Sequence, residues 1–462
     1  MKKFVLKSSV IAVAALFSSA AFAIVDINGN TGQVTYASEL TYSATNPLVG
    51  DGAGQLAAAT QLGFGVSTGQ TRFVKITLNN ATFAGSAGGM AVTDGTTTSL
   101  GTVVQGGTTG TNSVVYQFTA ATNYTQAAAV IIGDPTGGLA VANNGSPVTI
   151  SYQLFETATQ AVAGTPSLAS AGPTALAKFS PGLKYTVTRG TATADVASGF
   201  KLFCANASCT PPDTQVGDLG TIAYGVNAVN NRNGAAITLA DLTTAATAIH
   251  LSGDFSAVGG VTAGTAGCAG PAAPGAFTVA TNKQSATVTV GTSAATFDVC
   301  YVVNGTTVLS AQTVQQSLDV TPANADVTIS DTAAAPLGDV VRNGASTVAL
   351  NVTDPANPDQ TFIRITNMGT LDGKVTGTLI GQDGTTLGAA DTVLSPALAA
   401  KGTLVMSSSQ LAAAFGVTGW TGRAKLVIVG EIPAGQLRAQ NMIRTPNGTL
   451  VNVGGDTSTN GN

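Results

Sequence analysis

Charged side chains are scarce in this chain. Asp, Glu, Lys and Arg make up only 9% of its 462 residues, against roughly a quarter in ordinary soluble domains, and there is a single histidine. General acid–base and nucleophilic catalysis depend mainly on these residue types. We therefore expect a structural or surface protein rather than an enzyme.

The balance of the few charges excludes a nucleic-acid-binding surface. With the three lysines near the amino terminus set aside, the chain has 16 basic and 23 acidic residues, a net charge of −7. Nucleic-acid-binding domains carry basic patches instead. With so little charge on the surface, electrostatic repulsion between copies of the chain is weak. A secreted β-protein with a neutral surface fits this composition, and so does a surface selected to contact other copies.

The first 23 residues have the features of a secretory signal peptide. Lysines precede the apolar run Val10–Phe17, and Ala21-Phe22-Ala23 has the A-x-A form of a cleavage site. The apolar run is too short to cross a bilayer, and no later run of ~20 apolar residues follows. We therefore expect cleavage before Ile24 and export of the mature chain. The polar residues 456–462 predict a disordered tail.

Four cysteines occur in the middle third of the chain: Cys204, Cys209, Cys268 and Cys300. Export into an oxidising compartment favours two disulfides, for which three pairings are possible. We favour the pairs that are adjacent in sequence, because each closes a loop within one predicted domain. The second pair would stabilise the fold by on the order of 3 kcal/mol. The spacings typical of a zinc site are absent.

Apolar and polar residues alternate with period two along most of the chain, which predicts an all-β fold. The clearest runs are Arg72–Leu78, Val114–Phe118, Val148–Phe155, Leu183–Thr188, Ser285–Val290, Phe297–Val303, Thr361–Thr366, Lys374–Ile380 and Lys425–Val429. We expect three consecutive antiparallel β-sandwich-like domains with few short helices. Their predicted bounds are residues 24–165, 166–322 with both disulfides, and 323–455.

Local signals refine this prediction. The Pro/Ala/Ser-rich stretch Gly164–Pro173 is typical of a linker, and Gly259–Gly275 of a long loop held by a cysteine. Asn304-Gly305 after a strand predicts a tight hairpin turn. Ser407 with Gln410 predicts a capping box at the start of a helix, which Gly416 would end.

One segment matches a catalytic motif. Gly65-Val66-Ser67-Thr68-Gly69 has the G-x-S-x-G form of a nucleophile elbow, which needs a helix after the serine and a histidine as base. A β-strand pattern follows Ser67 instead, and His250 lies in another predicted domain. We therefore interpret the motif as a glycine-rich turn.

Calcium ligands are a second possibility. Asp26–Asn30 begins like an EF-hand loop, but Thr31 and Ala37 stand where that loop requires Gly and Glu. Asp354 and Asp359 offer two carboxylates in a looser arrangement and are weak candidates for binding Ca²⁺. A β-turn stiffened by proline explains the same residues equally well.

Several segments resemble a known class of protein. In the last third these are Phe362–Asn367, Gly373–Gly377, Gly381–Gly384, Leu387-Gly388, Gly416–Ala424 and Ile443–Leu450, and earlier ones are Leu62–Arg72 and Asp195–Phe200. They are similar to S-layer-like, self-assembling surface proteins of Gram-negative marine proteobacteria. The resemblance implies a cell-surface array made of copies of the chain and brings no active-site residues. No segment resembles an anchor, so a contact with the outer membrane or its lipopolysaccharide is an expectation.

Two other functions remain open. The chain could be an adhesin or carbohydrate-binding surface protein that works as a dispersed monomer. It could also be a filament subunit joined by exchanged strands, with Ile24-Val25-Asp26-Ile27 as the donor strand.

Overall fold

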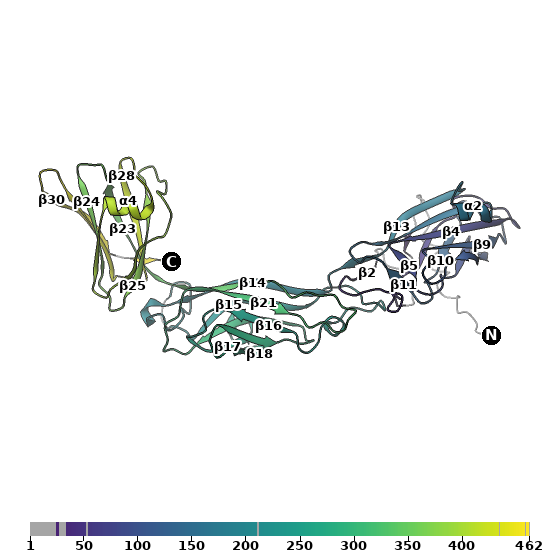
Figure 1. Ribbon diagram of the computed structural model, residues 1–462, viewed down its shortest axis with the longest axis horizontal. Helices are drawn as coiled ribbons and strands as arrows, with labels where there is room; N and C mark the ends of the chain where they lie inside the picture. Colours follow the sequence, from purple (N-terminus) through teal and green to yellow (C-terminus); the bar gives the residue numbers. More distant parts are fainter. Residues whose placement is uncertain are drawn as a thin grey trace.

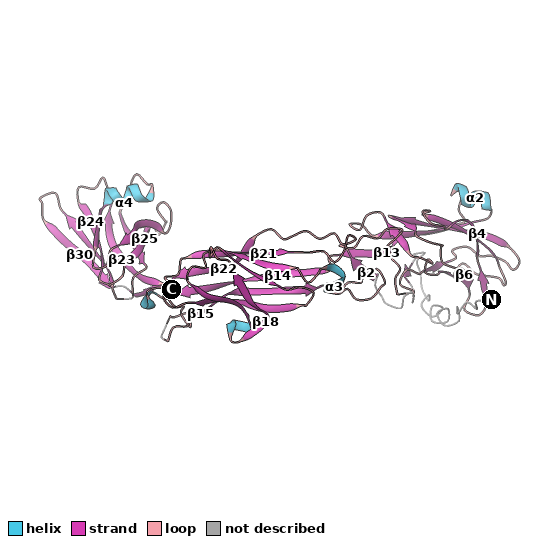
Figure 2. Cartoon of the chain, turned by 60° about the horizontal axis from the view of Figure 1, so that its bottom comes forward, coloured by secondary structure: helices cyan, strands magenta, loops and turns pink. Residues whose placement is uncertain are grey.

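The computed structural model describes residues 25–26, 34–51, 54–209, 212–433, 435–457 and 459–461. Three β-rich units follow one another along the longest axis of the molecule (Figure 1). The helices are few and short (Figure 2). The predicted all-β fold is confirmed. The expected signal peptide, residues 1–23, lies outside the described residues. None of the described helices has the length and apolar character needed to cross a membrane.

The first unit is a sandwich of two main sheets. Five strands pair in the order β1-β3-β10-β6-β7, six in the order β2-β13-β12-β4-β9-β8, and β5 with β11. The elements are β1 (Val25–Asp26), β2 (Val34–Ala37), β3 (Ala58–Gln61), β4 (Thr71–Asn79), β5 (Ala81–Phe83), β6 (Met90–Thr93), β7 (Thr98–Leu100), β8 (Thr102–Gly106), β9 (Ser113–Thr119), β10 (Ala129–Ile132), β11 (Leu139–Val141), β12 (Val148–Phe155), α2 (Ala158–Ala163) and β13 (Ala169–Ser180). Strands β2 and β13 pair in parallel.

In the second unit, nine strands form one sheet that closes on itself, in the order β14-β15-β20-β17-β18-β19-β16-β21-β22. The elements are β14 (Leu183–Ala194), η1 (Val196–Ser198), β15 (Val216–Val226), α3 (Leu239–Leu242), β16 (Ala248–Ser252), β17 (Val258–Gly264), η2 (Ala266–Cys268), β18 (Pro271–Val279), β19 (Ser285–Thr289), β20 (Ala295–Val303), β21 (Gln312–Asp319) and β22 (Ala335–Arg342). Strand β14 pairs first with β15 and then, in parallel, with β22. The sheet therefore closes as a barrel, in which β14 and β18 each pair with a strand on both sides.

Three glycines allow β14 to change partners. Gly190 stands opposite Gly338, at the point where β14 leaves β15. A Cβ atom on Gly338 would lie 2.0 Å from the carbonyl oxygen of Leu219, and one on Gly190 would lie 2.5 Å from the backbone nitrogen of Gly220. Strand interiors carry glycine where another backbone approaches this closely. Close contact with neighbouring backbone therefore leaves no room for a side chain at Gly190 or Gly338.

The third unit packs a five-stranded sheet, β26-β25-β28-β23-β31, against a four-stranded sheet, β27-β24-β29-β30. The elements are β23 (Gly344–Thr353), β24 (Gln360–Asn367), β25 (Gly373–Ile380), β26 (Thr392–Leu398), β27 (Thr403–Ser407), α4 (Ser408–Phe415), β28 (Arg423–Gly430), β29 (Leu437–Arg444), β30 (Leu450–Thr457) and β31 (Thr459–Gly461). The predicted capping box of Ser407 and Gln410 starts α4, and Gly416 ends it with φ 67°. The single tryptophan, Trp420, is buried in this unit.

Strand pairing moves both predicted boundaries. Residues 169–180, expected to follow a linker and open the second domain, form β13 and pair with β12 of the first unit. Residues 335–342, expected in the third domain, form β22 and pair with β14 and β21 of the second unit. Residues 169–173 have small side chains, and this composition led to the prediction of a linker. Their backbone nevertheless pairs with β12 in the six-stranded sheet of the first unit.

Three local expectations are also wrong. Residues 258–264 and 271–279 are strands rather than one long loop, and their glycines make room for neighbours: a Cβ on Gly264 would lie 2.4 Å from the sulfur of Cys300. After β20, the Asn304 side chain accepts hydrogen bonds from the Thr306 and Thr307 amides, so the chain leaves the sheet instead of forming a hairpin. Residues 459–461, part of the expected disordered tail, form a strand that pairs with β23. Strand pairing uses backbone groups, so polar side chains do not prevent it.

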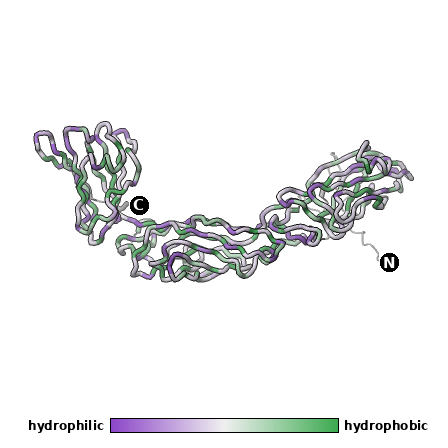
Figure 3. The backbone as a smooth tube through the Cα atoms, in the orientation of Figure 1, coloured by the Kyte–Doolittle hydropathy of each residue, from purple (hydrophilic) through white to green (hydrophobic). Residues whose placement is uncertain are grey.

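Each unit has its own buried core. Hydrophobic and hydrophilic stretches alternate along the backbone in all three units (Figure 3). In β24, for example, Ile363 and Ile365 are buried while Arg364 is exposed, as the alternation predicts. The first core also includes residues Val229, Ile237, Leu242 and Val327 of the second unit. This sharing makes the first two units one packed body.

Candidate functional site

The junction between the first and second units is held by backbone hydrogen bonds. The Ala37 amide donates to the Asn230 carbonyl at 2.9 Å, and the Asn230 amide donates to the Thr35 carbonyl at 2.9 Å. The Thr41 amide donates to the Asp326 carbonyl at 2.8 Å on the other side. Such pairing fixes direction as well as distance, so this junction does not act as a flexible linker.

Two side chains complete the first junction. The Glu39 carboxylate accepts hydrogen bonds from the amides of Gly182 and Leu183, where the chain enters the second unit. The buried Gln55 accepts from the Tyr36 hydroxyl at 3.0 Å and donates to the Gly234 carbonyl at 3.0 Å. Gln55 thus links Tyr36 of the first unit to the backbone of the second, and its burial is compensated by both hydrogen bonds.

A single residue, Asn343, connects the second and third units, because β22 ends at Arg342 and β23 begins at Gly344. Arg342 forms an ion pair with Glu431 at 2.9 Å, and both side chains are 22% exposed. Its guanidinium also donates to the Leu309 carbonyl and lies 4.7 Å from the centre of the Phe200 ring. Arg342 therefore links β22, a loop of the second unit and the third unit.

Asn343 is itself held by the second unit. Its amide nitrogen Nδ2 donates to Asp195 Oδ1 at 2.7 Å, and its Oδ1 accepts from the Val196 amide at 2.6 Å. The same Nδ2 lies 3.5 Å from Cys204 Sγ. The linker residue is therefore fixed against the loop that carries the first disulfide.

Both cysteine pairs that the sequence analysis favours are bonded in the structure. Cys204–Cys209 closes a short loop beside Asn343, and Cys268–Cys300 ties η2 to β20. Among the described residues, the one cluster of three potential metal ligands is Asp195, Cys204 and Cys209. Because both sulfurs are in the disulfide, only the carboxylate of this cluster is available to an ion.

The first unit exposes a sheet edge that carries no charge. Strand β8 is the last strand of the six-stranded sheet, and β7 is the last strand of the five-stranded sheet. Leu100, Val103 and Val104 are 63%, 50% and 46% exposed. No charged residue occurs from Gly95 to Gly133. Natural proteins usually protect such edges with charged residues, proline or a β-bulge. β8 has neither a charged residue nor proline, and the register shift between Val103 and Gln105 is its irregular point.

Exposed apolar side chains are concentrated in the terminal units. Among the described residues, large hydrophobic side chains are exposed at six positions in the first unit, two in the second and eight in the third. Those of the third unit are Leu350, Met368, Leu371, Val393, Val405, Val429, Leu450 and Val451. The parts of the molecule best suited to apolar contact therefore lie in its two end units.

The four-stranded sheet of the third unit has a basic outer face. Arg364, Arg438 and Arg444 are all exposed. The register places them on one face, because Arg438 stands opposite Thr366 and Arg444 opposite Gln360. None of the ion pairs in the described part of the chain involves these arginines. The face is therefore open to an anionic partner.

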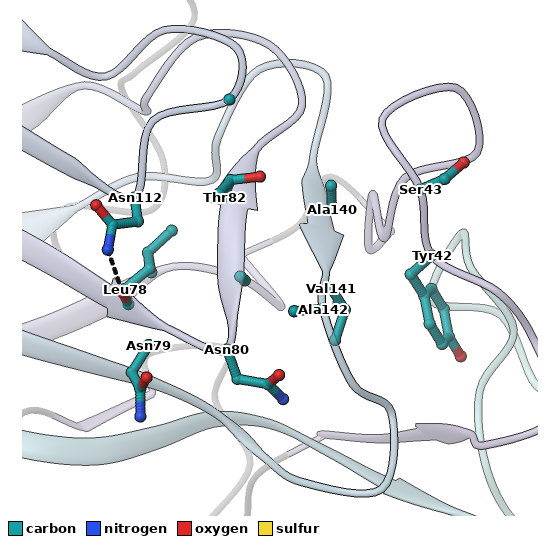
Figure 4. Close-up of a pocket in the computed structure, with 12 residues that line it drawn as sticks. Tyr42, Ser43, Leu78, Asn79, Asn80, Thr82, Asn112, Ala140, Val141 and Ala142 are labelled. Atoms are coloured by element: carbon teal, nitrogen blue, oxygen red, sulfur yellow. Dashed lines mark hydrogen bonds between the residues drawn. The ribbon is translucent and has the colours of Figure 1, made fainter.

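A hollow of about 380 Å³ lies between β4, β5 and β11 of the first unit (Figure 4). Asparagine side chains line it together with small and apolar residues, and Tyr42 is its only titratable lining residue. Burial raises the pKa of the Tyr42 hydroxyl above its ordinary value. The Asn80 amide donates to the Asn143 and Ser146 carbonyls, and Asn112 donates to Leu78. These lining groups serve local structure and offer no acid or base near neutral pH.

The structure places Ser67 of the catalytic motif and the candidate base His250 in different units. Ser67 lies in an exposed turn before β4, where the Gln70 amide donates to the Ser67 carbonyl at 3.0 Å. His250 lies on β16 of the second unit, between Thr287, whose hydroxyl is 3.0 Å from Nδ1, and Asp319, 3.4 Å from Nε2. Sequence reasoning missed these neighbours because they lie on other strands. β16 is paired on both sides, so ladder bonds occupy its backbone donors.

The weak calcium candidates are occupied by donors of the chain. Asp354 accepts hydrogen bonds from the Trp420 amide at 2.6 Å and the Ala356 amide at 2.7 Å. Asp359 lies 3.5 Å from Arg423. This arrangement is that of a structured turn. The other candidate, Asp26–Asn30, lies mostly outside the described residues, although the backbone of Val25–Asp26 pairs with β3.

No curated protein matches the chain. Among solved structures, BcpA, the major pilin subunit of Bacillus cereus, is 12% identical over 81% of this chain and 90% of that chain, with a TM-score of 0.22. The B domain of a biofilm associated protein is 8% identical over 62% and 79%, with a TM-score of 0.17.

A family model gives the decisive match. The model described as S-layer protein Slr4 matches residues 61–440, which include parts of all three units and the junction between the second and third. The chain therefore belongs to the S-layer protein Slr4 family.

Proposed function

We propose that this chain is the structural subunit of a layer that self-assembles on the surface of a Gram-negative cell. Membership of the S-layer family supports a structural protein of the cell surface. The observation that carries the self-assembly is the concentration of exposed apolar side chains in the two end units, together with the uncharged edge of β8.

Rigid junctions suit this function. In a two-dimensional array each subunit repeats the same contacts, so its contact surfaces must keep fixed relative positions. Interfaces that do not close into a ring propagate indefinitely. An apolar surface on the first unit of one copy against the third unit of the next would propagate in this way.

The edge of β8 gives a direct test. Val103→Lys with Val104→Lys places charges on an exposed strand, where the fold has no need of the valines, so the chain should still fold. The matched control is Val308→Lys, which changes an exposed valine of the second unit. We expect wild type and control to form large assemblies and the double variant to stay dispersed in light scattering. Equal assembly of all three proteins would contradict a role for β8.

The basic face of Arg364, Arg438 and Arg444 supports a contact with the anionic outer-membrane surface or its lipopolysaccharide. Binding to lipopolysaccharide vesicles should weaken as salt is added, because salt screens charge attraction. Changing the three arginines to glutamine should abolish this binding. Unchanged binding by the triple variant would reject this face as the anchor.

The alternative functions predict other outcomes. An adhesin that works alone would remain monomeric at high concentration. A filament joined by exchanged strands would form fibres, for which β1 would have to leave its pairing with β3 of its own chain. The same scattering and imaging experiments separate these outcomes.

A further inference from the structure

The edge strands of the main sheets differ in how well they resist pairing with another chain. Natural edges are protected by charge, proline, a β-bulge or short length. Strand β26 contains Pro396, and register shifts interrupt β8, β26 and β30. Strands β1, β7 and β31 have only two or three residues, and β2 also pairs with Asn230.

Strand β27 in the third unit has none of these protections. Its five residues, Thr403–Ser407, pair with β24 in an unbroken register. No charged residue and no proline occur from Gly402 to Gly422. Val405 at the centre of the strand is 48% exposed. The described part of the chain thus leaves this edge open to a further strand.

The pairing with β24 shows which backbone groups of β27 are available. The Asn367 amide donates to the Gly402 carbonyl at 3.0 Å, so these two residues form a hydrogen-bonded pair. Such pairs alternate with non-hydrogen-bonded pairs along an antiparallel ladder. The odd-numbered residues of β27, with Val405 at the centre, therefore direct their N–H and C=O groups away from β24. The Ser407 amide agrees with this pattern, because it donates to Gln410 Oε1 at 2.9 Å.

The side chains of β27 suit a second copy of the same strand. Polar Thr403 and Ser407 flank Leu404, Val405 and Met406, so the order of polar and apolar residues is the same in both directions. Antiparallel pairing about a two-fold axis can place Val405 opposite itself, where the two copies exchange two backbone hydrogen bonds. Leu404 then stands opposite Met406 of the second copy, and cross-strand apolar pairs of this kind stabilise sheets.

The faces of the strand fix this register. Met406 is buried and Leu404 is half-buried, whereas Val405 is exposed on the opposite face. A shift by one residue would place inward side chains of one copy beside outward side chains of the other. With Val405 opposite itself, the inward side chains of both copies lie on one side and continue the buried layer.

We propose that β27 pairs in antiparallel fashion with β27 of a second copy and joins two four-stranded sheets into one of eight strands. This inference rests on the proposed self-assembly and names one of its contacts. The two-fold axis is perpendicular to the sheet, so both copies present the same face to the same side. Arg364 stands opposite Val405 on the outer face. The basic faces of both copies therefore point the same way, as a layer on an anionic surface requires.

The contact has a limited size and a definite place in the array. A two-fold interface closes at two copies and does not propagate by itself. Together with the proposed contact between the first and third units, it supplies a second direction. A pairing of five residues is smaller than a standard interface of ~800 Å² per partner. It is therefore weak for two isolated copies and is reinforced by the other contacts of an array.

A single introduced cysteine tests the pairing in the full mature chain. All four native cysteines are in disulfides, so Val405→Cys adds the one free thiol. Residues in a hydrogen-bonded antiparallel pair have Cα atoms about 5.5 Å apart, a separation that a disulfide spans. Under mild oxidation we expect this variant to shift from monomer to dimer in non-reducing gels, linked through position 405 in peptide maps. The control Val393→Cys changes an equally exposed valine of β26 and should stay monomeric.

Light scattering of the wild type in parallel separates this inference from the proposed array. Large assemblies, with no more dimer from Val405→Cys than from Val393→Cys, would overturn the pairing and leave the array standing. Dimers of Val405→Cys without large assemblies of the wild type would support the pairing and contradict the array. Absence of both would reject both.

A proline variant tests the same contact without a thiol. Val405→Pro removes an amide that does not bond to β24, so it should melt near the temperature of the wild type. Loss of two hydrogen bonds between copies should raise the concentration needed for assembly roughly tenfold. The control Leu404→Pro removes an amide that bonds to β24 and should melt at a lower temperature. Assembly of Val405→Pro at the wild-type concentration would overturn the pairing, and so would melting as low as that of Leu404→Pro.

Discussion

Replacing Arg342 by methionine should loosen the third unit from the second. Methionine keeps an aliphatic chain over Phe200 but removes the ion pair with Glu431 and the hydrogen bonds to the Leu309 carbonyl. Hydrogen bonds of charged groups contribute about 1.5–3 kcal/mol each, and a cation–π contact about 0.5–1 kcal/mol at exposed sites. These contributions are not additive, so we expect a loss of about 2–4 kcal/mol.

That loss corresponds to a roughly 30- to 1,000-fold larger population of the open junction, since about 1.4 kcal/mol is a factor of ten. Hydrogen exchange should report it at the Asn343 amide, which is bonded to the Ala194 carbonyl. Small-angle scattering should show a broader distribution of distances than in wild type.

The matched control is Arg189→Met. Arg189 forms an ion pair with Asp339 at 2.8 Å, but its side chain is 53% exposed. Exposed pairs contribute about 0.2–1 kcal/mol. Equal exchange at Asn343 in the two variants would refute the reasoning that Arg342 holds the junction.

Three further predictions concern the fold and Ser67. Changing Cys268 and Cys300 together to alanine should lower the free energy of unfolding by about 3–4 kcal/mol in urea titrations, and a Cys204–Cys300 peptide in non-reducing maps would contradict the pairing. Gly338→Ala should destabilise the second unit strongly, because its Cβ would lie 2.0 Å from the Leu219 carbonyl oxygen. The control Gly260→Ala, with open space around it, should melt near the temperature of the wild type. Similar melting temperatures for the two variants would contradict the requirement for glycine at position 338. Ser67→Ala should leave any measured esterase activity unchanged, and labelling of Ser67 by a fluorophosphonate would overturn that expectation.

Strands with clear alternation could be predicted from sequence alone. Val148–Phe155 is β12 to the residue, and the helix after Ser407 begins and ends at its predicted caps. Local patterns suffice there because side-chain burial and capping act within a few residues. Strand β13 has small side chains and little alternation, so it escaped the same reasoning.

The junctions could not be predicted, because their partners are far apart in sequence. Arg342 and Glu431 are separated by 89 residues, and Asp195 and Asn343 by 148. Nothing local marks Asn343 as a linker whose side chain is held by Asp195 and Val196. Only the pairing of strands brings these groups together.

Electron microscopy of the purified mature protein at neutral pH, with and without millimolar Ca²⁺, tests the central proposal most directly. Self-assembly predicts flat sheets with a two-dimensional lattice, matched by a lattice on intact cells. Dispersed single molecules at high concentration under both conditions, or unbranched fibres, would contradict it.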